Sequence, residues 1–156
     1  SLERCVDDAL LNLSSPIHES SAAVERGRLP RVQVDPTLVT QLYQNLIGNA
    51  VKFRAPDRDP RISLTAAING GEVILGVTDN GIGIDQKFAE HIFEPFRRLH
   101  SDSEFEGSGI GLSICRKVVE RHGGRLWMES SEGEGSCFLF TLPLAIDDPP
   151  GGASHR

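Results

Sequence analysis

The sequence predicts an α+β fold, in which helices lie on one face of a mixed or antiparallel sheet. Two observations support this prediction. Apolar runs rich in β-branched residues occur in pairs joined by glycine-containing turns, first within 61–78 and again within 125–142. Before and between these pairs, apolar residues recur at helical spacing. A chain of 156 residues is long enough to bury one core of this kind.

The first part of the chain is predicted to hold a helix and two short strands. The helix is amphipathic, has three or four turns, and is interrupted or ends near Pro16. Strands are expected at 22–25 and 31–34, on either side of a turn at 27–30. The apolar residues that recur at helical spacing in the first helix are Val6, Leu10, Leu13 and Ile17.

A long helix is predicted from Asp35 to about Phe53. The pair Asp35-Pro36 is typical of an N-cap followed by proline in the first helical position. A polar loop bounded by prolines follows at 54–60. The apolar stripe of this helix consists of Leu38, Val39, Leu42, Leu46 and Ile47.

The second half of the chain is predicted to contain two hairpins and two helices. A polar segment at 97–108 has no apolar periodicity, so we expect a mobile loop there. The expected elements are a hairpin of strands 61–68 and 72–78, a short helix at 85–92, a helix from about 110 to 122, and a hairpin of strands 125–129 and 136–142.

Composition excludes several classes of function. A net charge of −6 argues against non-specific affinity for nucleic acid or for an anionic membrane. No apolar run reaches the length of a membrane span, and the three cysteines are too dispersed for a metal or redox motif. We expect a domain at 1–146, with its N-terminal helix in 1–20, and a flexible tail at 147–156. The chain reads as part of a longer protein, since its only methionine is Met128.

Three polar side chains are spaced along one side of the long helix. Asn45, Asn49 and Lys52 lie at i, i+4 and i+7. Magnesium takes one or two protein oxygens together with phosphate oxygens, so an asparagine carbonyl suits it, and Lys52 can neutralise phosphate charge. A solvated helix face explains this motif equally simply, and for this motif alone it is the commoner explanation.

A carboxylate stands at the end of an apolar strand. Asp79 enters a turn that contains Gly81 and Gly83. A carboxylate in this place can accept a hydrogen bond from the exocyclic amine of adenine, and the glycines let the backbone approach a flat ring. A plain Asx-type turn also accounts for Asp-Asn-Gly.

A glycine-rich motif opens the helix that starts near 110. Its backbone amides and the helix N-terminus favour an anion. It differs from the dinucleotide fingerprint at Leu112, where that pattern needs glycine, and the chain has no Gly-Lys dipeptide for a Walker A loop. The polar segment before it suggests a closing lid, although a merely flexible loop remains an alternative. The motif consists of Gly107, Ser108, Gly109, Ile110, Gly111 and Leu112.

Two phenylalanines precede the polar segment. Phe93 and Phe96 stand on either side of Glu94-Pro95. We expect them to be core aromatics that close a short helix, and they can also anchor one end of the lid. Arg97 and Arg98 follow, and either can reach a γ-phosphate or be a solvated charge.

In this order, the motifs resemble the N box, first glycine box, F box and second glycine box of the catalytic and ATP-binding domain of two-component sensor histidine kinases. The resemblance covers about 32–144, and segments 45–54 and 93–100 look most like phytochrome-type and related multi-sensor kinases. It implies a two-layer α/β sandwich, the Bergerat fold. The sheet would be mixed, largely antiparallel and of about five strands, covered on one face by about three helices, with ATP and Mg²⁺ held between the N-box helix and the lid.

The resemblance implies a role for each matched residue. Asn49 binds Mg²⁺, Lys52 contacts phosphate and Asp79 accepts the adenine amine, while Gly81 and Gly83 shape the adenine pocket. The implied catalytic set is Asn45, Lys52 and Arg98. The residues expected to bind ATP are Asn45, Asn49, Lys52, Phe53, Asp79, Gly81, Gly83, Ile84, Phe96, Gly107, Ser108, Gly109, Ile110, Gly111 and Leu112.

The family's phospho-accepting histidine sits on a separate dimerisation helix, followed by an acidic residue and then a basic residue and proline. None of the five histidines of this chain has that context. We therefore expect the catalytic part of a cytoplasmic kinase, a monomeric domain that acts on the dimerisation helices of its parent and, indirectly, on a response regulator. Nucleic acid and direct membrane contact are not expected.

Two other functions compete with the kinase. A clamp-type hydrolytic ATPase resembling gyrase B and the mismatch-repair proteins shares the fold, but those relatives place a glutamate base one helical turn before the magnesium asparagine. This chain has Asn45 there, which cannot act as a general base. A nucleotide-binding but inactive regulatory module is the third possibility, and the intact motifs argue against it.

Overall fold

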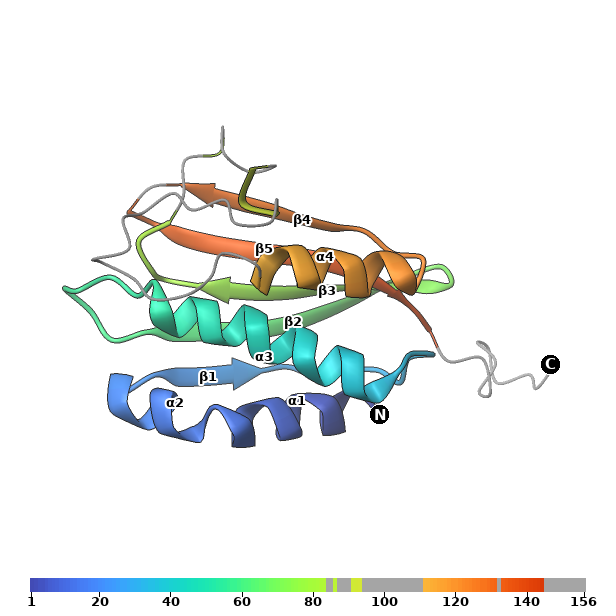
Figure 1. Cartoon of the computed structure of the whole chain (residues 1–156), viewed down its shortest axis with the longest axis horizontal. Coiled ribbons are helices and arrows are strands. Elements are labelled where there is room, and N and C mark those ends of the chain that lie inside the picture. The colour runs from blue at the N-terminus through green and yellow to red at the C-terminus, as the bar shows by residue number, and fades with distance from the viewer. Residues whose placement is uncertain (84–85, 87–90, 94–110, 132, 145–156) are drawn as a thin grey trace.

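The protein forms a five-stranded sheet with helices on one face (Figure 1). The computed structural model describes residues 1–83, 86, 91–93, 111–131 and 133–144. The strand order is β1-β2-β3-β5-β4, in which β1 runs parallel to β2 and the other pairs are antiparallel. The strands are β1 (Ala23–Arg26), β2 (Arg61–Asn69), β3 (Glu72–Asp79), β4 (Leu126–Ser131) and β5 (Gly135–Pro143).

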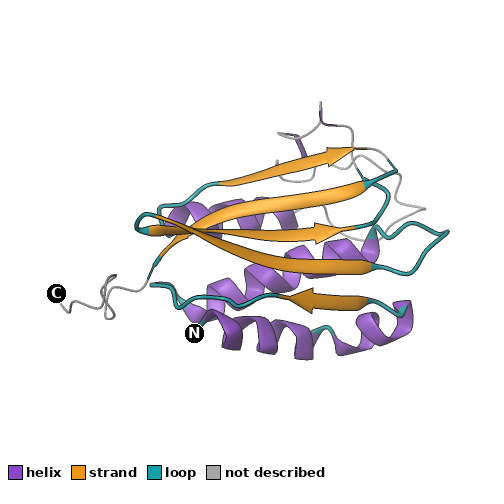
Figure 2. Cartoon of the chain, turned by 180° about the vertical axis from the view of Figure 1, so that it is seen from behind, coloured by secondary structure: helices purple, strands orange, loops and turns teal. Residues whose placement is uncertain are grey.

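The predicted α+β fold with a mixed, largely antiparallel sheet is confirmed. Figure 2 shows the face of the sheet that the described helices leave uncovered. The described helices are α1 (Leu2–Asn12), α2 (Ser14–Ser20), α3 (Pro36–Lys52), the 3₁₀ helix η2 (His91–Phe93) and α4 (Gly111–Arg121).

The core lies between the sheet and the helices. Alternate residues of each central strand point to it, because side chains of a strand alternate between the two faces. In β3 and β5 the large buried apolar residues follow this period of two, and α3 buries the predicted apolar stripe except Leu38, which is half-buried. These core residues are Val73, Leu75, Val77, Phe138, Phe140, Leu142, Val39, Leu42, Leu46 and Ile47.

Helix α3 begins as the sequence predicts. Asp35 is the N-cap, and its Oδ1 accepts hydrogen bonds from the backbone N–H groups of Thr37 at 3.0 Å and Leu38 at 3.3 Å. These bonds satisfy two amides that have no partner within the helix. At the end of α4, His122 Nε2 accepts a hydrogen bond from the backbone N–H of Asp35, at 3.0 Å, so the start of α3 is fastened to the neighbouring helix.

The predicted interruption of the N-terminal helix near Pro16 is confirmed, and one predicted strand differs from the structure. The helix is divided at Leu13 into α1 and α2, because Pro16 lacks an N–H for the continuing helix and is accommodated in the first turn of α2. The strand predicted at 31–34 is wrong, since only Val32 forms an isolated bridge, to Leu144. Strand β5 is paired with β3 along 137–143 and with β4 along 135–140, so only its end is available to the segment around Val32.

Tyr43 of α3 is fully buried, and its hydroxyl has no hydrogen-bond partner among the residues that the structure describes. Its ring packs edge-on against Phe140, with 5.5 Å between the ring centroids. Burial raises the pKa of the Tyr43 hydroxyl, so it stays protonated. A buried donor without a partner costs about 1–3 kcal/mol.

We therefore expect Tyr43→Phe to raise the free energy of unfolding, by about 1 kcal/mol. The variant keeps the ring contact with Phe140 and removes only the unsatisfied hydroxyl. Urea unfolding of both proteins measures the difference, and a clear loss of stability in the variant would show that the hydroxyl is satisfied after all.

Candidate nucleotide site

The ends of several elements meet at one edge of the sheet. Helix α3, strand β3 and strand β4 all end on the left side of Figure 1, where β5 begins. Asp79 is the last residue of β3, and the loops that follow α3 and β4 lie beside it. The first two predicted motifs, which are 30 residues apart in sequence, therefore belong to the same region of the molecule.

The three polar residues of the N-box helix are all half-buried. Asn45 lies next to the start of α4, because its Oδ1 is 3.9 Å from the point where a Cβ on Gly111 would stand. The thiol of Cys115 donates to the carbonyl of Leu42 at 4.0 Å, and the nearby amide of Asn45 acts to lower the pKa of that thiol. Burial nevertheless raises the pKa of that thiol to about 12, so Cys115 is neutral and inert. The structure thus brings the N-box helix together with the end of the second glycine box.

Asp79 uses one carboxylate oxygen for two backbone amides. Oδ1 accepts hydrogen bonds from the N–H of Gly81 at 2.9 Å and from the N–H of Ser136 at 3.2 Å. The first bond closes the local Asx-type turn that the sequence allows. The second bond comes from β5, 57 residues away in sequence. Within the described part of the chain, no hydrogen bond reaches Oδ2.

The carboxyl of Asp79 is electrostatically unusual. Burial raises its pKa, and the two amide hydrogen bonds from Gly81 and Ser136 oppose that rise. Burial disfavours the charged form because it removes water from the carboxylate. A buried carboxyl at a strand end, with a raised pKa and one oxygen that no described residue contacts by a hydrogen bond, is typical of a binding site.

Glycine is required at three positions around Asp79. A Cβ on Gly81 would stand 2.5 Å from the carbonyl oxygen of Phe53, and Gly83 has φ +74°. Gly135, with φ +92°, carries no side chain because a Cβ would collide with the carbonyl group of Asp79. Sequence reasoning missed this role of Gly135, since a glycine in Glu-Gly-Glu-Gly reads only as a hairpin turn.

The loop after β3 is fastened to both of its neighbours. The N–H of Ile82 donates to the carbonyl of Phe53 at 3.1 Å, and the N–H of Gly133 donates to the carbonyl of Ile82 at 2.6 Å. The side chain of Asn80 accepts from the N–H of Arg61 at 2.8 Å and donates to the carbonyl of Asp59 at 3.1 Å. Asn80, for which the sequence predicts only a turn, is therefore structural.

Two further predicted aromatic residues lie in different places, Phe53 beside the loop after β3 and Phe93 in the core. Phe53 is half-buried at the end of α3, and Lys52 Nζ lies 5.6 Å from the centroid of its ring. Phe93 is buried, and its ring packs edge-on against Phe138, with 6.1 Å between the centroids. The interpretation of Phe93 as a core aromatic is confirmed.

Several predicted residues lie outside the described residues. The mobile lid predicted at 97–108 and the flexible tail at 147–156 also lie there, as does most of the helix predicted at 85–92. These assignments remain predictions. The site residues concerned are Ile84, Phe96, Arg98, Gly107, Ser108, Gly109 and Ile110.

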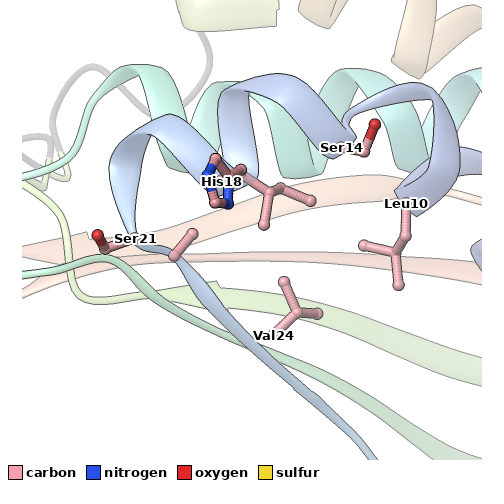
Figure 3. Close-up of a pocket in the computed structure, with 7 residues that line it drawn as sticks. Leu10, Ser14, His18, Ser21 and Val24 are labelled. Carbon is pink, nitrogen blue, oxygen red and sulfur yellow. The ribbon is translucent and has the colours of Figure 1, made fainter.

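A separate pocket opens between α2 and the edge strand β1 (Figure 3). Its polar lining is limited to His18 and the hydroxyls of Ser14 and Ser21, beside apolar side chains such as Leu10 and Val24. It contains none of the residues predicted to bind nucleotide. In the described part of the chain, no helix is long and apolar enough to cross a membrane, and no group of three or more His, Cys, Asp or Glu residues could hold a metal ion.

Comparison with known proteins agrees with this arrangement. Residues 34–146 match the model of the family described as histidine kinase-, DNA gyrase B- and HSP90-like ATPases. The phytochrome-like protein Cph1 of Synechocystis is 45% identical over 143 residues, which is 92% of this chain and 19% of Cph1. The chain thus spans about a fifth of the length of that relative.

Solved structures of histidine kinases have the same fold. The nucleotide-free catalytic domain of ThkA superposes with a TM-score of 0.74 at 29% identity, covering 91% of this chain and 93% of that domain. Full-length ShkA in complex with AMPPNP gives a TM-score of 0.78 at 30% identity, over 93% of this chain and 30% of ShkA. ThkA has also been crystallised with the response regulator protein TrrA. That structure superposes with a TM-score of 0.73 at 26% identity, covering 93% of this chain and 41% of the matched chain.

The predicted resemblance is confirmed by the family model, by the relative and by these structures. The chain belongs to the histidine kinase-, DNA gyrase B- and HSP90-like ATPase family, within which it is a catalytic ATP-binding domain of the sensor histidine kinase type.

Proposed function

We propose that this domain transfers the γ-phosphoryl group of ATP to a histidine imidazole on a separate dimerisation domain. The observation that carries the choice of reaction is Asn45, which stands one helical turn before Asn49 and beside the start of α4. An amide cannot take a proton from water, so the hydrolytic reaction of the clamp-type relatives has no base here. In the transfer, an imidazole nitrogen bonds to the γ-phosphorus as the bond to the β-phosphate oxygen breaks, and ADP leaves.

Adenine is assigned to Asp79. Its Oδ1 is occupied by the amides of Gly81 and Ser136, so Oδ2 is the oxygen for the exocyclic amine of the base. Gly81 and Gly83 leave room for the ring, and Phe53 lines the edge of the pocket. The other residues predicted to contact ATP are proposed to bind it from the side of the lid. They are Ile84, Phe96 and residues 107–112.

Magnesium is assigned to Asn49. The donor set fits this ion, because Mg²⁺ takes few protein oxygens when phosphate oxygens complete its shell, and an asparagine carbonyl offers one. When bound, the ion neutralises phosphate charge. Asn45 and Lys52 contact the phosphates, and Arg98 is the basic residue proposed at the γ-phosphate.

The partners proposed follow from the reaction. The acceptor is the histidine-bearing dimerisation domain of the parent protein, and a response regulator receives the phosphoryl group afterwards. The crystallisation of ThkA with TrrA supports a regulator as the downstream partner. We also propose that the domain is cytoplasmic and monomeric, and its net charge of −6 argues against affinity for nucleic acid or for an anionic membrane.

Asp79→Asn should reverse the hydrogen-bonding character of the base site. The asparagine keeps one oxygen for Gly81 and Ser136, and places an NH₂ group where Oδ2 stands. ADP affinity should fall about ten- to a hundredfold, equivalent to roughly 1.5–3 kcal/mol. Inosine diphosphate carries an oxygen in place of the adenine amine, so its affinity should rise. Calorimetric titration with both nucleotides measures this, and unchanged ADP affinity would refute the assignment of adenine to Asp79.

Stability provides the control for the same variant. Because burial raises the pKa of Asp79, the native state binds this proton more tightly than the unfolded chain. The resulting stability is present below about pH 4 and is lost as the pH rises through the folded-state pKa. Asp79→Asn removes this loss, so the free energy of unfolding at pH 7, without nucleotide, should be at least that of the wild type. A less stable variant would show that the carboxylate serves the fold.

Asn49→Ala should weaken the magnesium-dependent part of ADP binding. Since its side chain is only half-buried, the thermal stability of the nucleotide-free protein should change little. Gln44→Ala is the matched control, because it removes another half-buried amide of the same helix, one that accepts a hydrogen bond from Asn12. ADP titrations with and without Mg²⁺ make the comparison. A large loss of stability in Asn49→Ala alone would make Asn49 a structural residue.

The reaction itself is tested with and without an acceptor. The chain alone should neither retain label from γ-³²P-ATP nor hydrolyse ATP quickly, because a missing general base costs about a hundred- to ten-thousandfold. With the dimerisation domain of its parent, it should produce an acid-labile, base-stable phosphohistidine. Rapid hydrolysis by the chain alone, abolished by Asn45→Ala, would favour the clamp-type ATPase.

A further inference from the structure

The loop after β3 leaves backbone carbonyls that the sheet does not pair. Asn80 and Gly81 follow the last residue of β3, so their C=O groups lie beyond the ladders to β2 and β5. The carbonyl of Gly133, in the turn between β4 and β5, faces the same region. Carbonyls near a buried site need donors, because an unpaired backbone group is costly.

Arg58 supplies these donors from the loop between α3 and β2. Its Nε donates to the carbonyl of Asn80 at 2.7 Å, and its Nη2 donates to the carbonyls of Gly81 at 3.1 Å and Gly133 at 2.9 Å. The side chain is 35% exposed, and its Nη1 lies 3.2 Å from Asp57 Oδ1. One guanidinium therefore joins three loops, and its rigid fork is suited to several acceptors at once.

Arg58 is linked to Asp79 through a single peptide unit. The C=O of Asn80 and the N–H of Gly81 belong to the same trans peptide, and so point in opposite directions. Arg58 holds the carbonyl side of this unit, while Asp79 Oδ1 accepts from its N–H side at 2.9 Å. Burial raises the pKa of Asp79 and the two amides oppose that rise, while Arg58 is not among the groups that shift it, so Arg58 acts on the carboxylate by orienting the backbone.

We propose that Arg58 is a positioning residue for base selection. By holding the peptide between Asn80 and Gly81, it fixes the rotation of the Asp79 carboxylate, so that Oδ1 stays on the amides and Oδ2 faces the amine of adenine. The inference rests on the proposed adenine site at Asp79. Arg58 touches neither the base nor the phosphates in this account, and the sequence gives no local signal for it, because its contacts are 22, 23 and 75 residues away.

The test is the ratio of ADP to inosine diphosphate affinity. Arg58→Ala should lower ADP affinity about tenfold, the effect of losing one well-placed hydrogen bond to a charged group, and should lower the ratio by about as much. Arg58→Lys keeps the charge but reaches fewer carbonyls, so its affinity ratio should lie between those of the wild type and Arg58→Ala. Arg28→Ala, an exposed arginine on the loop after β1, is the matched control for net charge and should leave the ratio unchanged.

A double-mutant cycle isolates the route of the effect. In an Asp79→Asn background, Arg58→Ala should change ADP affinity less than about twofold, because the carboxylate it positions is gone. The inference would be overturned if Arg58→Ala left the ratio of ADP to inosine diphosphate affinity unchanged, or if it lowered ADP affinity equally in the wild-type and Asp79→Asn backgrounds. Arg58 would then only stabilise the fold. If Arg58→Ala does not fold, Arg58→Lys carries the same two comparisons.

The proposed function fails by a different result. Wild-type protein without affinity for ADP, or Asp79→Asn with wild-type affinity and ratio, would refute the adenine site itself. A large effect of Asp79→Asn together with none from Arg58→Ala refutes only the role of Arg58.

Discussion

The site depends on the hydrogen bonds that hold one oxygen of Asp79. Oδ1 is shared by the amide of Gly81, which follows in the chain, and by the amide of Ser136 on β5. These two bonds require β3 and β5 to be adjacent, which the strand order provides. They also require glycine at 81 and 135, where a side chain would collide with Phe53 or with Asp79. Much of the local architecture is therefore a consequence of how this carboxylate is held.

Holding the carboxylate in this way has an energetic cost. Burial disfavours its charged form, and the two amides offset only part of that effect. A ligand amine directed at Oδ2 would supply the missing stabilisation of the charge. The arrangement is accordingly better suited to a nucleotide complex than to the free protein, a conflict between stability and function that is common in binding sites.

The sequence was sufficient for features that are encoded locally. Alternation and helical spacing located most strands and the apolar stripe of α3, and Asp35-Pro36 located the start of that helix. The strand at 31–34 was wrongly predicted because pairing depends on which edges of the sheet remain open, and β3 and β4 already occupy most of the length of β5.

The candidate site was predictable to a similar extent. Asp79 and its glycines form a local pattern, so the sequence was enough to suggest them. Arg58, Ser136 and Gly135 were missed because their roles arise only when three distant loops meet. The contact between Asn45 and Cys115 likewise depends on the packing of α4 against α3. Long-range contacts of this kind leave no spacing that a single sequence can display.

The most direct test of this account is the titration of the Asp79 carboxyl itself. Carbon-13 NMR of protein labelled at aspartate, with Asp79→Asn to assign the signal, would follow its pKa with and without ADP. The account predicts a raised pKa in the free protein and a fall when ADP binds, because an amine that donates to Oδ2 favours the charged form. A pKa that ADP leaves unchanged would contradict the assignment of Asp79 as the group that recognises adenine.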